Sequence, residues 1–158
     1  MCLAFDARAS TRDVDAYFEP SVEVLEAALR VAAREGLPES WLNDAVKGYL
    51  SDRGSFEPFL HLAHLQVFCA RPDYMLAMKC LAMRIGEGFH DEQDVRYLVR
   101  NLGLQRLEEA REILARYYAL QRYPVTAMLL LEELLSPPDR SIRPRGRKGA
   151  SGSRVGGS

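Results

Sequence analysis

The chain has few cysteines, no long hydrophobic run and no glycine before Gly36, and each shortage excludes a class of protein or site. Its three cysteines, at positions 2, 69 and 80, form no CxxC pair, so we expect free thiols in a reducing cytoplasm and no sulfur-based metal site. The longest apolar runs, such as 127–131, are far shorter than the ~20 residues that a membrane-spanning helix needs. Residues 1–5 are too few for a signal peptide.

The composition is that of one globular domain with an unusual charge distribution. The 158 residues are 47% hydrophobic and 27% charged, which is enough apolar material for a real core. From Asp139 onward the chain has six basic residues and one acidic residue, whereas the preceding part has 15 basic and 21 acidic residues. We therefore predict a domain over 1–138 and a disordered basic tail over 139–158, which either touches nucleic acid through phosphates or is only solvated.

The spacing of apolar residues and the positions of glycine and proline predict an α+β fold, with a small mixed sheet and a helix-rich C-terminal half. Extended segments are expected at residues 13–18 and at Leu65–Ala70, where β-branched and aromatic residues gather. Helical spacing and stop signals predict helices over residues 22–35, 41–50, 74–85, 91–101, 107–118 and 125–135. Gly36 is a natural stop for the first of them, and Pro137 prevents the last from continuing.

Asp13 and Asp15 form an Asp-x-Asp pair at the start of the first extended segment. Residues two apart in a strand point to the same face, so this spacing presents two carboxylates together. Mg²⁺ prefers oxygen ligands and commonly uses one or two carboxylates plus substrate phosphates. The pair therefore indicates phosphoryl or nucleotidyl transfer, and the alternative is an ordinary turn ahead of a short strand.

Lys79 and the pair Asp91 and Asp94 are further candidates. The lysine lies among apolar residues of a predicted helix, where a buried ammonium needs a partner. Either its side chain reaches solvent or forms a structural ion pair, or it contacts a bound phosphate. Asp91 and Asp94 are three apart and therefore share a helix face. They suit a helix start, where carboxylates satisfy N–H groups and the dipole, and Asp94 is also placed to pair with Lys79.

Four phrases of the sequence resemble a bacterial family of nucleotidyltransferase-like proteins related to abortive-infection toxins of the AbiEii type. They occur in the family's order, at residues 10–18 (STRDVDAYF), 36–48 (GLPESWLNDAVKG), 74–82 (YMLAMKCLA) and 91–98 (DEQDVRYL). The resemblance implies transfer of a nucleoside monophosphate from an NTP to an acceptor hydroxyl of RNA or protein, with Mg²⁺ as cofactor. It also implies a cognate toxin or antitoxin as partner.

The resemblance assigns roles to individual residues. Asp13, Asp15, Lys79 and Asp94 would be catalytic. Thr11, Arg12, Lys47 and Lys79 would bind the nucleotide. Asp13 and Asp15 would hold the metal, with Asp44 as a third carboxylate, although an ion pair of Asp44 with Lys47 would also explain these two residues.

The chain departs from the family at one motif. The family places a Gly-Gly or Gly-Ser pair before its Asp-x-Asp, at a helix start whose N–H groups hold phosphate. No such pair precedes Asp13 here, so we expect the chain to begin inside the fold, without the first strand. The alternative to an active enzyme is therefore a noncatalytic or truncated member that acts as a binding or regulatory partner.

Overall fold

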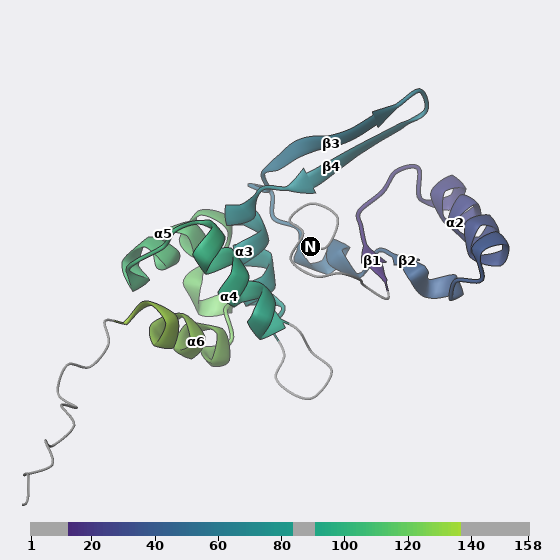
Figure 1. The fold of residues 1–158 in the computed structure, drawn as a ribbon. Helices are drawn as coiled ribbons and strands as arrows, with labels where there is room; N and C mark the ends of the chain where they lie inside the picture. Colours follow the sequence, from purple (N-terminus) through teal and green to yellow (C-terminus); the bar gives the residue numbers. More distant parts are fainter. Residues whose placement is uncertain (1–12, 84–90, 137–158) are drawn as a thin grey trace, which may run out of the picture.

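The α+β fold predicted from the sequence is confirmed by a computed structural model, which describes residues 13–83 and 91–136 (Figure 1). An N-terminal part with two short strands and a helix leads into a β-hairpin, and a group of helices follows. Within the described residues the strands form two separate two-stranded sheets, where the sequence predicted one small mixed sheet.

The N-terminal part contains β1 (Val14–Asp15), α2 (Ser21–Glu35), a 3-10 turn η1 (Glu39–Trp41), β2 (Leu42–Asn43) and a second 3-10 turn η2 (Ala45–Tyr49). β1 and β2 pair in parallel, with Asp15 opposite Asn43. α2 ends as predicted at Gly36, whose φ of 67° is a left-handed conformation that favours glycine. The Trp41 indole N–H donates to the carbonyl of Ala28 at 3.0 Å and fixes η1 on α2.

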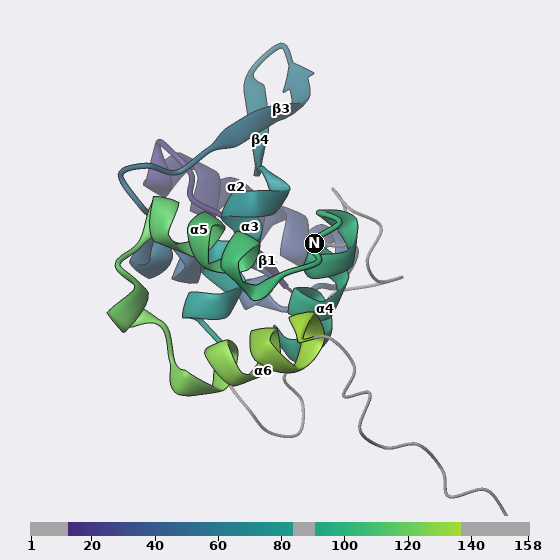
Figure 2. The same ribbon diagram turned by 90° about the vertical axis from the view of Figure 1, so that its left-hand side faces the viewer.

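The hairpin consists of β3 (Phe56–Leu62) and β4 (Leu65–Ala70), which pair antiparallel. It projects from the rest of the molecule in both views (Figures 1 and 2). At its base the Arg71 N–H donates to the Ser55 carbonyl at 2.9 Å, which closes the hairpin, and Ala70 is buried in the core of the body. The sequence predicted β4 with its observed bounds.

The helical body holds the main core and consists of α3 (Pro72–Leu81), α4 (Asp91–Asn101), α5 (Leu107–Tyr117), a 3-10 turn η3 (Leu120–Arg122) and α6 (Val125–Leu135). Apolar side chains at helical spacing on these elements pack together, and the largest fully buried ones are Tyr74, Leu76, Val95, Leu98, Leu114 and Leu131. Val46 and Leu50 from the N-terminal part pack against this cluster. Burial of such side chains is what stabilises the body.

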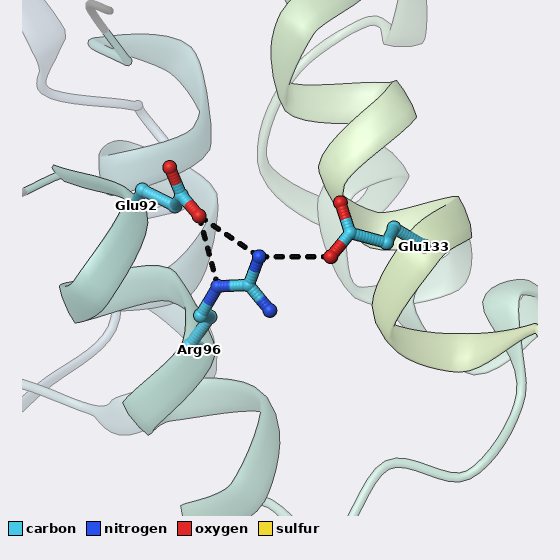
Figure 3. A network of polar contacts seen from close by, with 3 residues as sticks. All are labelled: Glu92, Arg96 and Glu133. Carbon is cyan, nitrogen blue, oxygen red and sulfur yellow. Dashed lines mark hydrogen bonds and ion pairs between the residues drawn. The ribbon is translucent and has the colours of Figure 1, made fainter. Parts of the chain in front are cut away.

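Arg96 links α4 to α6 on the surface of this body (Figure 3). Its Nε and Nη2 donate to Glu92 Oε1 at 3.0 and 2.8 Å, and Nη2 also donates to Glu133 Oε1 at 2.9 Å. These hydrogen bonds, that of Glu133 first, raise the pKa of the Arg96 guanidinium. Both glutamates are largely exposed, so the network contributes little to stability, about 1 kcal/mol or less.

Three local predictions are wrong. The helix expected over 41–50 is replaced by η1, β2 and η2, because Trp41 is anchored to α2 and Asn43 pairs with β1. The strand β3 was not predicted, since Pro58 and a bulge between Pro58 and Leu60 interrupt its alternation. The helix expected over 74–85 starts earlier, at Pro72, where proline is favoured, and ends at Leu81.

No helix in the described ranges is both long enough and apolar enough to cross a membrane. The predicted disordered tail over 139–158 lies outside the described residues.

Candidate functional site

Lys79, Asp91 and Asp94 lie together where the end of α3 meets the beginning of α4. The Lys79 ammonium is 2.8 Å from Asp94 Oδ2 and 3.7 Å from Asp91 Oδ1. The Asp94 side chain is 2% exposed, whereas the Lys79 side chain keeps 26% of its surface accessible. The pairing of Asp94 with Lys79 that the sequence suggested is therefore present.

Local sequence explains why these charges meet. Lys79 is in the last turn of α3, where a cation complements the helix dipole, and both aspartates are in the first turn of α4, where anions do. Apolar neighbours on α3, such as Ala77 and Cys80, are buried and fix the orientation of the helix. The ammonium carries three donors, so its contacts with Asp94 and Asp91 leave a donor for an anion at the accessible side.

Asp13 and Asp15 lie in an extended run whose burial alternates. Val14, Ala16 and Phe18 are half-buried, whereas Asp13, Asp15 and Tyr17 are exposed. This alternation places the two carboxylates on the solvent side of the run. Only Val14 and Asp15 have strand geometry, so the strand is shorter than the predicted extended segment.

Lys47 lies near the same run. Its ammonium is 6.0 Å from the ring centroid of Tyr17, a distance at which a cation–π attraction is weak. Asp44 is exposed and precedes η2, and within the described part of the chain no ion pair joins it to Lys47. Asn43, opposite Asp15, accepts a hydrogen bond from the Ala45 N–H at 3.0 Å and shapes this turn.

Thr11 and Arg12, the other predicted nucleotide-binding residues, lie outside the described residues. Among residues 13–83 and 91–136, no group of three or more His, Cys, Asp or Glu side chains is arranged to hold a metal ion. Asp13, Asp15 and Asp44 thus do not form such a group of three.

Sequence reasoning missed a tyrosine cluster that positions α3. Tyr74 is fully buried and its hydroxyl accepts a hydrogen bond from the Ser51 N–H at 2.8 Å. Its ring centroid lies 4.8 Å from that of Tyr117 on α5. Tyr117 in turn donates to Asp73 Oδ2 at 2.8 Å, and burial followed by this bond raises the pKa of the Tyr117 hydroxyl.

The cluster extends to two further tyrosines and to η2. Tyr118 donates to the Tyr49 carbonyl, and Tyr123 donates to the Leu114 carbonyl at 3.0 Å. Burial is the main cause that raises the pKa of both phenols. The abundance of tyrosine in 117–123 was the available signal, but the partner at Tyr49 is 69 residues away and no spacing rule identifies it.

Comparisons of this chain with models of protein families, with curated proteins and with solved structures found no match.

Proposed function

We propose that this chain is a Mg²⁺-dependent nucleotidyltransferase-like protein that transfers a nucleoside monophosphate from an NTP to an acceptor hydroxyl. The observation that supports it best is the Lys79 ammonium, which a nearly buried carboxylate holds in a fixed direction while part of the lysine remains accessible. A fixed cation stabilises the charge that develops on phosphate oxygens during transfer, because it needs no reorganisation. In this proposal Lys79 contacts the phosphates, and Asp94 positions Lys79.

Asp13 and Asp15 fit the metal of this proposal through the chemistry of their donors. Both are exposed carboxylates on one side of an extended run, and Mg²⁺ is commonly bound by one or two carboxylates together with substrate phosphates. The bound ion would neutralise phosphate charge and orient the triphosphate. Thr11, Arg12 and Lys47 would contact the nucleotide, and the acceptor would be RNA or a protein side chain.

The test is transfer of label from each of the four α-labelled NTPs, with Mg²⁺, to total bacterial RNA or to protein acceptors. We expect labelling that Asp13→Asn, Asp15→Asn and Lys79→Met each abolish, because they remove a metal ligand or the phosphate contact. Glu23→Gln, on the exposed face of α2, is the matched control and should label normally. Asp94→Asn should reduce the rate less than Lys79→Met, since it loosens the lysine without removing it.

Labelling that survives in the Asp13→Asn, Asp15→Asn double variant would exclude the metal pair from the mechanism. Circular dichroism of each variant separates loss of chemistry from loss of fold. Labelling that requires no divalent cation would contradict the magnesium assignment.

The second candidate function is a noncatalytic binding or regulatory partner, in the manner of a toxin–antitoxin pair. The exposed apolar side chains of the β3–β4 hairpin favour it, because large apolar groups in contact with water commonly mark an interaction site. Absence of transfer with every NTP, together with retained capture of a protein partner that depends on the hairpin, would select this function over the first.

A further inference from the structure

The β3–β4 hairpin exposes many large apolar side chains to solvent. Phe56, Phe59, Leu60, Leu62, Leu65 and Phe68 are each between 43% and 54% exposed. Within the described part of the chain no third strand joins this sheet. An isolated two-stranded hairpin is at best marginally stable in water, so a sheet of this kind gains stability from a further strand.

The two outer edges of the hairpin differ in their capacity to accept such a strand. β3 contains Pro58, which has no N–H to donate, the charged Glu57 and the bulge between Pro58 and Leu60. Proline, charge and a bulge each hinder the pairing of an edge strand with a further strand. β4, with the sequence LQVFCA, has no proline, no charged residue and no bulge of this kind.

The side chains of β4 are also arranged for pairing with a copy of itself. Leu65, Val67 and Cys69 alternate with Gln66 and Phe68 and therefore share one face of the strand. Across the hairpin Leu60 pairs with Val67, and Leu62 with Leu65, so β3 extends the same apolar face, which Glu57 bounds where it lies opposite Cys69. An antiparallel pairing centred on Val67 would oppose Leu65 of one copy to Cys69 of the other and bring no like charges together.

We propose that β4 pairs antiparallel with β4 of a second copy of this chain, so that two hairpins form one four-stranded sheet. The two-fold symmetry of this contact is closed, because each copy offers the same edge and uses it once. The proposal goes beyond the proposed enzymatic function and does not depend on it. The uncharged, self-complementary edge favours a second copy over a charged partner segment.

The experiment is the molar mass of the full chain by light scattering at micromolar concentration. We expect twice the 17.8 kDa of one chain. Val67→Asp should give the monomer mass, because it opposes two carboxylates at the centre of the contact, and mixing it with Val67→Lys should restore the doubled mass. Leu60→Asp is the matched control, since it places the same charge on the same face but on β3, and it should remain a dimer.

A conservative pair of variants covers the case in which the charged variants do not fold. In a background with Cys2→Ser and Cys69→Ser, Val67→Cys should form a disulfide-linked dimer on mild oxidation, and Leu60→Cys should not. A monomeric wild-type chain, or an unchanged mass in Val67→Asp, would overturn the proposal. Equal loss of the dimer in Leu60→Asp and Val67→Asp would also overturn it, in favour of stacking through the apolar face.

Discussion

The Asp94 carboxylate of α4 accepts a hydrogen bond from the Lys79 ammonium of α3 at 2.8 Å and is itself 2% exposed. This contact joins the last turn of one helix to the first turn of the next, across residues 84–90 of the sequence. It is therefore both a tertiary tie and the feature that gives Lys79 a fixed direction. Its structural and chemical roles can be separated by measuring stability and transfer in the same variants.

Asp94→Asn should destabilise the fold more than Asp91→Asn. The first change removes the charge of a buried ion pair at 2.8 Å, which we expect to lower the free energy of unfolding by about 1–3 kcal/mol. The second weakens a contact of 3.7 Å, which is too long for a hydrogen bond, so we expect a smaller cost. Urea unfolding followed by circular dichroism measures both. Equal costs would mean that Asp94 is not the main partner of Lys79.

Sequence periodicity was sufficient for α4, α5, α6 and β4, and it predicted the presence of α3 but not its bounds. Apolar residues recur at helical spacing in these helices, and glycines such as Gly36 and Gly103, with φ of 67° and 65°, mark helix ends. It failed where tertiary contacts determine the backbone. Asn43 is extended because it pairs with Asp15, and no local signal in 41–50 announces that contact.

The candidate site was partly predictable for a physical reason. A lysine among apolar residues needs a partner, and acidic residues at the start of the next helix supply one, so the contact of Lys79 with Asp94 followed from burial and charge. That Asp13 and Asp15 share one face followed from strand alternation, whereas the exposure of that face did not. The tyrosine cluster could not be predicted in this way, because its contacts join distant residues. The Ser51 hydroxyl, for example, donates to the Tyr117 backbone carbonyl at 2.7 Å across 66 residues of sequence.

Gly54→Ala should destabilise the protein through Tyr74. A Cβ at Gly54 would lie 2.9 Å from Cε1 and 3.0 Å from the hydroxyl of this fully buried ring. The ring cannot retreat freely, since its hydroxyl is bonded to the Ser51 N–H, so we expect a loss of about 1–3 kcal/mol. Gly48→Ala is the matched control, because a Cβ there meets nothing within 4 Å. Thermal unfolding of both variants is the measurement, and similar melting temperatures would contradict the predicted clash.

Cys80 should be inert to thiol reagents in the folded protein. Its side chain is fully buried in α3, and burial raises the pKa of its thiol to about 12, so little of the reactive thiolate forms near neutral pH. A Cys2→Ser, Cys69→Ser variant should give no colour with Ellman's reagent until denaturant is added, and then one thiol per chain. Rapid reaction of the native variant would show that α3 opens readily around Lys79.

Tyr123 should make the fold sensitive to alkaline pH. Burial raises the pKa of its phenol above the ordinary value of 10.0, and the hydroxyl donates to the Leu114 carbonyl inside the core. The folded state thus holds this proton more tightly than the unfolded state does. The resulting stability is fully present below the unfolded pKa and is lost as the pH rises from there towards the folded pKa, by up to about 1.4 kcal/mol per pH unit for one group.

Tyr123→Phe isolates this contribution from the other groups that titrate in the same range, including Tyr118 and Cys80. At neutral pH the variant should be less stable by about 1 kcal/mol, because the Leu114 carbonyl loses the tyrosine hydroxyl and keeps only the Tyr118 N–H as a donor. Between about pH 10 and about pH 11 its free energy of unfolding should fall less steeply than that of the wild type, so the two curves converge. Urea unfolding of both proteins over this range is the measurement. Parallel curves would mean that Tyr123 ionises as readily in the folded chain as in the unfolded one, and the tyrosine cluster would then be more open to water than its burial in the structure implies.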